Sequence, residues 1–129
     1  MCMRVLFVCV GNTCRSQIAE AIARDMGHDA FSAGTNPPDG GMVAENALVV
    51  LKEEGVDTTG LFAKSLDHLE LEEFDRTISM GCGVSCPSIE IDEDWGLEDP
   101  QGRGLEVFRK TRDEIRELVS MLVKSDTDA

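Results

Sequence analysis

The sequence predicts an α/β fold: a single doubly wound domain with a central parallel sheet of about four strands, flanked by helices. Short apolar runs rich in β-branched residues alternate along the chain with longer stretches of helical periodicity, as they do in parallel sheets. The chain has 129 residues, which suits one domain, and contains neither an internal repeat nor a linker. We therefore expect one domain over residues 1–129.

The first three elements follow directly from this pattern. Residues 4–9 are a short apolar run that stops at Gly11, which predicts a strand buried on both faces. Residues 16–26 predict a helix that ends at Gly27. Its apolar side chains recur at helical spacing and form one buried face: Ile18, Ala19, Ala21, Ile22 and Met26. Residues 30–34 predict a second short strand.

The middle of the chain alternates in the same way. Residues 35–41 contain two prolines and two glycines and predict a loop. Residues 42–54 predict a second helix. Four of its apolar side chains are expected to point inward: Val43, Ala47, Val50 and Leu51. A short acidic helix is expected within residues 66–74, and residues 76–80 predict the third strand, ended by Gly81.

The last third of the chain begins with a turn-rich loop at residues 82–87, followed by a fourth strand at 88–93 and a second loop at 95–104. Helical spacing then continues from Leu105 to about Val123. Its apolar positions are Leu105, Phe108, Ile115, Leu118, Val119 and Leu122. The tail at 125–129 is expected to fray.

The charge balance restricts the partners. Twelve Lys and Arg against 25 Asp and Glu give a net charge of −13, so nucleic acid would be repelled. The acidic residues are spread along the chain, which favours a solvated surface over a docking face for a basic partner. No apolar stretch is long enough to span a membrane, and the N-terminus resembles no secretory signal. We expect a cytoplasmic protein.

Five cysteines without an export signal favour reactive thiols over structural disulfides. Ligands of parallel sheets bind beyond the carboxyl ends of the strands. This rule places residues 9–16, 82–87 and 95–104 on one rim of the sheet. Of the five cysteines, only Cys2 is expected away from this rim. A four-thiolate zinc site is disfavoured, because the gaps between the cysteines exceed the usual two residues.

The segment that starts at Cys9 has the composition of an oxyanion-binding loop. It lies between a strand and a helix, so its backbone N–H groups can surround a tetrahedral anion. The oxyanion-binding residues are expected to be Val10, Gly11, Asn12, Thr13, Cys14, Arg15 and Ser16. Cys9 would be the nucleophile, Arg15 would clamp two oxygens and Ser16 could donate to the sulfur. The alternative is a strand-to-helix turn with an incidental cysteine. The Gly-Lys-Ser/Thr ending of an ATP-binding loop is missing.

The pattern Val-Cys-x-Gly-Asn-x-Cys-Arg-Ser, directly after the first strand, resembles the low-molecular-weight tyrosine phosphatase family and more closely its arsenate reductase branch. Ser32-Ala33-Gly34-Thr35 and Asp99-Pro100 also stand where the family has them, so the resemblance covers nearly the whole chain. Three features favour the reductase branch. Gln17 follows Arg-Ser where phosphatases have Pro, the chain has no Tyr, and Cys82 and Cys86 add two thiols.

The resemblance implies a reaction. Cys9 attacks arsenate, and Asp99 protonates the leaving oxygen as the general acid. Cys82 then attacks Cys9, which releases arsenite, and Cys86 takes over the disulfide. An external thiol reductant, thioredoxin or a low-molecular-weight thiol, would close the cycle. Only three residues separate Cys82 from Cys86, fewer than in thioredoxin-coupled members, so the order of attack and the electron donor stay open.

Two other functions remain. One is hydrolysis of phosphate monoesters, which shares the first step, and the other is a non-enzymatic arsenic or redox sensor. The resemblance implies no tightly bound cofactor and no metal, with a potassium site at Asn12, Glu20, Ser32 and Asp67 as the alternative. We expect a monomer.

The adjacent residues in the sequence predict the positions of three further side chains. We expect His28, and Arg112 of the last helix, at the surface. Trp95 is expected to be a packing anchor for the segment that carries Asp99.

Overall fold

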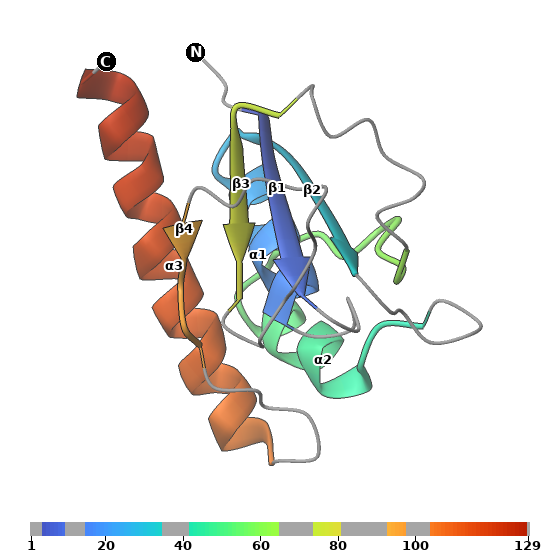
Figure 1. The fold of residues 1–129 in the computed structure, drawn as a ribbon. Coiled ribbons are helices and arrows are strands. Elements are labelled where there is room, and N and C mark those ends of the chain that lie inside the picture. Colours follow the sequence, from blue (N-terminus) through green and yellow to red (C-terminus); the bar gives the residue numbers. More distant parts are fainter. Residues whose placement is uncertain are drawn as a thin grey trace.

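A computed structural model describes residues 4–9, 15–34, 42–64, 74–80, 93–97 and 104–128 (Figure 1). Strands and helices alternate through these ranges as the sequence predicts. Their order is β1 (Arg4–Cys9), α1 (Arg15–Asp25), β2 (Asp29–Gly34), α2 (Glu45–Glu53), β3 (Arg76–Ser79), β4 (Glu93–Asp94) and α3 (Leu105–Asp128).

The four strands form a parallel sheet in the order β2-β1-β3-β4. Cys9 at the end of β1 pairs with Gly34 of β2, and Val8 pairs with Ser79 of β3. The chain leaves β1 towards one side to make β2 and later returns to the other side to make β3, so the strand order reverses there. Such a reversal opens a ligand-binding crevice at the carboxyl ends of the strands. The predicted α/β class is confirmed.

Strand β1 is buried on both faces, as its continuous apolar run predicts. Residues 5–8 have no exposed surface. Side chains alternate across a strand, and Val5, Phe7 and Cys9 belong to the core cluster that α1 covers. The nucleophile predicted at Cys9 therefore projects from the sheet on the same side as α1.

The helices pack against one another as well as on the sheet. Helix α1 contacts β1 and β2, and α3 contacts both α1 and α2 (Figure 1). The predicted inward faces are confirmed at Ile18, Ala19, Ala21, Ile22, Ala47, Val50 and Leu51, which are all buried. Met26 and Val43 pack at the edge of the same core.

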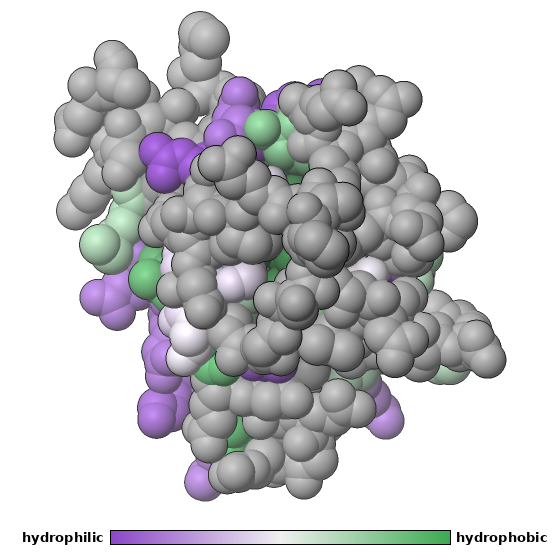
Figure 2. Space-filling model, viewed as in Figure 1, coloured by the Kyte–Doolittle hydropathy of each residue, from purple (hydrophilic) through white to green (hydrophobic). Residues whose placement is uncertain are grey.

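Helix α3 presents a polar side to solvent and a buried side to α1 and α2. Its hydrophilic side chains line the left edge of the molecule in Figure 2. The helix continues to Asp128, so the helix end predicted at about Val123 is wrong. Residues 124–128 contain no Gly or Pro that would stop a helix.

Arg112 is not on the exposed side of α3, contrary to its predicted place. It is 8% exposed, and its Nη1 donates to the Val50 carbonyl at 3.0 Å and to Glu53 Oε1 at 2.9 Å. The charge is tolerated there because α2 supplies both a carbonyl and a carboxylate as acceptors.

His28 is also buried, at 8% exposure, so its predicted surface position is wrong. Gly27 adopts a φ of 95° and ends α1 where predicted. This turn lets the His28 amide donate to the Ala23 carbonyl at 2.9 Å, which directs the following residues into β2.

The fourth strand is short. It spans Glu93–Asp94, whereas the prediction was residues 88–93, of which 88–92 lie outside the described residues. The predicted loops at 35–41 and 82–87 and nearly all of the acidic helix at 66–74 also lie outside them. Across the described ranges, every helix is too short or too polar to cross a bilayer.

Glu53 fastens α2 to α3 through two arginines. Arg109 Nη2 lies 2.7 Å from Glu53 Oε2, and Arg112 Nη1 lies 2.9 Å from Oε1. The hydrogen bond from Arg109, supported by Arg112, lowers the pKa of Glu53 below its ordinary 4.5. A carboxylate with a lowered folded-state pKa stabilises the fold above its unfolded-state pKa, and the stabilisation is lost as the pH falls through the folded value.

We expect Glu53→Gln to reduce the acid sensitivity of the fold. Wild-type protein should lose more stability than the variant as the pH drops below about 4.5, because only the wild type must protonate this carboxylate. Urea denaturation across that range measures the difference. Exposed Glu114→Gln serves as the control, and parallel profiles for wild type and Glu53→Gln would contradict the prediction.

Candidate active site

The candidate site lies where β1 ends and α1 begins. Cys9, the last residue of β1, is 4% exposed, and its Sγ lies 2.9 Å from Ser16 Oγ. Ser16 is fully buried in the first turn of α1. The contact joins the two elements, and when the sulfur is a thiolate the hydroxyl must be the donor. The predicted pair of Cys9 and Ser16 is therefore brought together.

The surroundings of Cys9 favour negative charge on its sulfur. The N-terminus of a helix carries a partial positive charge from its N–H groups, and a cysteine placed there is more readily ionised. The first turn of α1 contains no acidic residue that would cancel this effect. The hydrogen bond from Ser16 acts in the same direction.

Arg15 connects α1 to two other strands. Its side chain is buried, and Nη1 donates to the Met80 carbonyl at 3.1 Å and to the Leu97 carbonyl at 2.8 Å. Met80 directly follows β3, and Leu97 lies three residues after β4. Both contacts use one nitrogen of the guanidinium, so they fix the plane in which its five N–H donors lie. A fixed plane suits a clamp for a tetrahedral anion.

The two carbonyls held by Arg15 stand at the start of the segments predicted to carry the chemistry. The Met80 amide donates to the Val8 carbonyl at 3.0 Å, and the Leu97 amide donates to the Met80 carbonyl at 3.2 Å. Sheet-like pairing thus continues to the rim of the site. In the sequence, Cys82 comes two residues after Met80, and Asp99 comes two residues after Leu97.

Trp95 supports this rim. Its ring centroid lies 5.5 Å from that of Phe7, with the planes tilted by 50°, and it packs against the core cluster. Aromatic pairs in this range stabilise a structure beyond their buried area. Trp95 thus packs on the core as predicted, while Asp99, whose segment it was expected to anchor, lies outside the described residues.

Sequence reasoning underestimated the polar side chains of α1. Residues 15–23 are all buried, including Gln17 and Glu20. Gln17 Nε2 donates to the Phe62 carbonyl at 2.7 Å, and Glu20 Oε1 accepts from Ser32 Oγ at 2.6 Å. The available signal was the presence of four polar residues in an otherwise apolar helix segment. No sequence pattern identified Phe62 as the partner of Gln17, or Lys64 as a partner of Glu20.

The predicted site residues thus fall into two groups. Cys9 and Ser16 meet at the end of β1, and Glu20 meets Ser32 one turn further along α1. Arg15 precedes Ser16 in the chain, and its guanidinium bonds to the Met80 and Leu97 carbonyls. The remaining predicted residues lie outside the described ranges and stay predictions: 10–14, Asp67, Cys82, Cys86 and Asp99. Among the described residues, His, Cys, Asp and Glu side chains form no group of three that could hold a metal ion.

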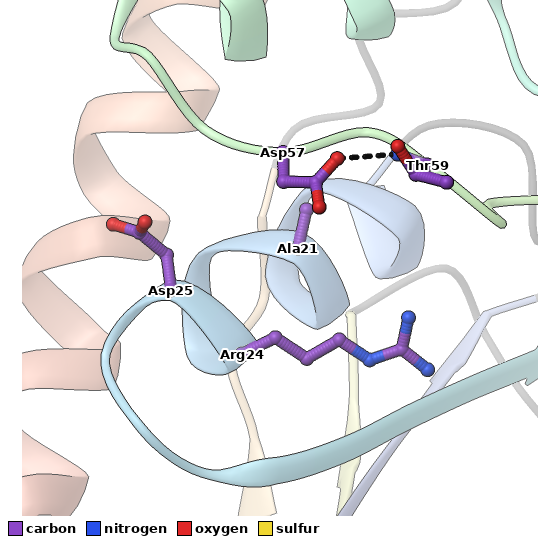
Figure 3. A pocket seen from close by; sticks show the side chains of 5 residues that line it. All are labelled: Ala21, Arg24, Asp25, Asp57 and Thr59. Atoms are coloured by element: carbon purple, nitrogen blue, oxygen red, sulfur yellow. Dashed lines mark hydrogen bonds between the residues drawn. The ribbon is translucent and has the colours of Figure 1, made fainter.

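A separate small pocket, of about 190 Å³, lies beside α1 and the segment around Asp57 (Figure 3). It is lined by Ala21, Arg24, Asp25, Asp57 and Thr59. Hydrogen bonds from Thr59 lower the pKa of Asp57. The pocket contains no cysteine and none of the residues predicted for the site.

Comparison with known proteins places this geometry in a family. The sequence pattern of the low molecular weight phosphotyrosine protein phosphatases matches residues 4–90. The chain belongs to this family. Within the family, it is 37% identical over 125 residues to a protein of Synechocystis sp. named glutaredoxin arsenate reductase, a match that covers 93% of this chain and 95% of that protein.

Solved structures of the family agree with the fold. A structure described as an arsenate reductase in the phosphate binding state has a TM-score of 0.86 and 37% identity, covering 95% of this chain and 98% of that one. A low molecular weight protein tyrosine phosphatase from T. tengcongensis has a TM-score of 0.79 and 35% identity, covering 95% and 99%. The predicted family and fold are confirmed.

Replacing the Ser16 hydroxyl tests its effect on the Cys9 thiol. We expect Ser16→Ala to slow the alkylation of Cys9 by iodoacetamide near neutral pH by roughly threefold to tenfold, because the thiolate loses one hydrogen bond. Peptide-resolved mass spectrometry follows Cys9 separately from the other thiols. Ser120→Ala, on α3, is the control. Identical pH profiles for Ser16→Ala and wild type would mean that the contact does not stabilise the thiolate.

Replacing the Arg15 guanidinium tests the connection to β3 and β4. Lysine keeps the charge but cannot place donors in a rigid plane. We expect Arg15→Lys to lower the free energy of unfolding by about 1–3 kcal/mol, the usual cost of losing buried hydrogen bonds to a charged group. It should also weaken the binding of orthophosphate. Urea denaturation and calorimetric titration measure the two effects, and unchanged stability would show that the carbonyl contacts carry no energy.

Proposed function

We propose that this protein reduces arsenate to arsenite, with Cys9 as the nucleophile and Cys82 and Cys86 as a thiol relay. One observation carries the proposal. Arg15 and Val8 hold Met80 beside the end of β1, where Cys9 stands. Cys82 follows Met80 by two residues, which reach about 7 Å at most when extended. The proposal requires this second thiol to come within reach of Cys9.

The family comparisons support this choice over other oxyanion chemistry. The relative from Synechocystis bears the name of an arsenate reductase, and so does the similar structure in its phosphate binding state. Phosphate and arsenate are both tetrahedral oxyanions, so a loop that binds one also accepts the other. A phosphatase of this fold has no use for a second and third thiol at the rim.

The first step forms a covalent adduct. Arsenate binds to the backbone N–H groups of residues 10–16, and the Arg15 guanidinium neutralises part of its charge. The Cys9 thiolate, stabilised by Ser16 and by the N-terminus of α1, attacks arsenic. An arsenic–oxygen bond breaks as a sulfur–arsenic bond forms, and Asp99 gives the leaving oxygen a proton so that it departs as water.

The second step transfers the electrons. The Cys82 thiolate attacks the sulfur of Cys9, and the sulfur–arsenic bond breaks. The electron pair of that bond stays on arsenic, which leaves as arsenite. Cys9 and Cys82 are oxidised together to a disulfide, so two thiols supply the two electrons that the reduction requires.

The third step resets the nucleophile. Cys86 attacks Cys82, which frees the Cys9 thiolate and leaves a disulfide between Cys82 and Cys86. An external thiol then reduces this disulfide. The name of the Synechocystis relative supports a glutaredoxin-linked donor, and thioredoxin is the competing donor that a side-by-side assay would separate.

Phosphate monoester hydrolysis is the second candidate. It is supported by the family pattern over residues 4–90 and by the similar tyrosine phosphatase structure. Both chemistries begin with attack by Cys9, so weak hydrolysis is compatible with the main proposal. An arsenic or redox sensor would bind arsenite without turnover.

We also propose that one chain acts alone, as a single domain and a monomer, in the cytoplasm. The relay needs its thiols reduced between turnovers, and the cytoplasm supplies that condition. Light scattering of the purified protein measures the oligomeric state.

A single turnover without added reductant distinguishes these functions. Fully reduced wild-type protein mixed with arsenate should release about one arsenite per chain and retain one disulfide, located at Cys82 and Cys86 by mass spectrometry. Cys82→Ser should release almost no arsenite but keep any phosphate ester hydrolysis, because the first step is intact. Cys2→Ser is the matched control.

Each other outcome rejects a specific part of the proposal. Arsenite release by Cys82→Ser would refute the relay. Ester hydrolysis by the wild type, with no arsenite and five free thiols, would identify a phosphatase. Tight arsenite binding without arsenate turnover would identify a sensor.

A further inference from the structure

Glu20 is a carboxylate in the interior of the protein. It lies on α1, one helical turn after Ser16, and its side chain is 1% exposed. Burying an ionised carboxylate costs several kcal/mol unless partners neutralise it and satisfy its oxygens. The mechanism proposed above does not use Glu20, so its burial calls for another explanation.

Three side chains surround this carboxylate. Ser32 Oγ donates to Oε1 at 2.6 Å, and Lys64 Nζ lies 3.3 Å from the same oxygen. Arg24 Nη1 lies 2.9 Å from Oε2. The side chain of Arg24 is 43% exposed, whereas that of Lys64 is only 12% exposed. Lys64 is therefore the buried counterion, and Arg24 screens the carboxylate from the solvent side.

Lys64 also helps to tie its own segment to two elements, β2 and α1, beside Cys9. Its backbone carbonyl accepts from the Gly34 amide at 2.8 Å, and Gly34 is the partner of Cys9 in the sheet. Its Nζ donates to the Phe62 carbonyl at 3.2 Å, which also accepts from Gln17 at the start of α1. The segment around Lys64 is thus fastened to the end of β2 and to the first turns of α1.

The charges around the Glu20 carboxylate do not fit a potassium site. Of the residues predicted to bind potassium, Glu20 and Ser32 are described, and the Ser32 hydroxyl already donates its hydrogen to Glu20. Among the described residues, Lys64 and Arg24 bring two positive charges to one carboxylate, a net charge of about +1 that would repel a further cation. An ammonium group carries the same charge as potassium and donates hydrogen bonds to the same kind of oxygen. The described residues therefore do not fit an additional potassium ion.

We infer that the Lys64 ammonium is a built-in monovalent cation, a positioning residue that holds α1 and the end of β2 around the Cys9–Ser16 pair without potassium. Burial lowers the pKa of Lys64, with a smaller contribution from Arg24, and Glu20 opposes the shift. Lys64 acts through Glu20 and touches no reacting atom. Its effect on arsenate turnover rests on the proposed function, whereas its effect on Cys9 reactivity does not.

The test compares wild type with Lys64→Ala in sodium, potassium and ammonium chloride at equal concentration. The readouts are the melting temperature and the pH dependence of Cys9 alkylation, neither of which requires arsenate. Wild type should respond equally to the three salts. In Lys64→Ala, Cys9 should be alkylated at least about threefold more slowly near neutral pH. This change corresponds to a rise of about half a unit in the pKa of the Cys9 thiol. Potassium or ammonium should restore much of this rate, because either can enter the space left beside Glu20.

Three further variants make the result specific. Lys110→Ala removes an exposed lysine, 70% exposed in its side chain, and should behave as wild type in all three salts. Lys64→Arg keeps a positive charge, so its Cys9 should be alkylated at the wild-type rate without potassium. The double variant Glu20→Gln with Lys64→Ala has no buried carboxylate, so it should lose the response to potassium.

Several outcomes would overturn the inference. Potassium that stabilises wild type above sodium would mean that Lys64 does not replace the ion, and this measurement needs no variant to fold. If the pH dependence of Cys9 alkylation were unchanged in Lys64→Ala, Lys64 would have no positioning role. If the alkylation rate fell and neither potassium nor ammonium restored it, Lys64 would be a packing residue only. Failure of the wild type to form arsenite would refute the proposed function alone, since alkylation and melting would still report on Lys64.

Discussion

A single nitrogen atom, Nη1 of Arg15, donates to the carbonyls that follow β3 and β4, at 3.1 and 2.8 Å. A buried guanidinium is costly unless acceptors surround it, and here the acceptors are backbone groups at the rim of the sheet. The same interaction sets the orientation of the guanidinium and the starting points of two segments of the site. One residue therefore holds the first residues of both segments, Met80 and Leu97, against α1.

The other polar side chains of helix α1 also bond to residues of other elements. Nine consecutive residues of it are buried, so its polar side chains must find partners inside the protein. The partners come from different elements: Cys9 from β1, Ser32 from β2, and Phe62 from the segment after α2. Each contact fixes one element relative to the helix, and a site on rigid elements is held more closely than one on loops. The cationic side chains of this region also oppose the acidic character of the rest of the chain, whose net charge is −13.

The sequence alone was sufficient for the fold class, the strands β1 and β3, and the pairing of Cys9 with Ser16, because these depend on short-range patterns. Apolar runs reveal buried strands, and a cysteine before a helix is typical of an anion site. It failed at Arg112 and His28, whose burial depends on acceptors and turns supplied by the three-dimensional packing. The partnership of Glu20 with Lys64 spans 44 residues and follows no periodicity, so no local pattern could reveal it. The helix end at Asp128 was missed because polar residues can continue a helix that nothing interrupts.

The acceptors of Arg15 are main-chain carbonyls, and this has an evolutionary consequence. Every amino acid offers the same carbonyl, so substitutions at positions 80 and 97 change side chains without removing the acceptors. The segments beyond them can gain or lose thiols and acids while the guanidinium keeps its attachment. A scaffold fastened in this way can exchange one oxyanion chemistry for another through changes in its rim alone, and its sheet and first helix need not be rebuilt.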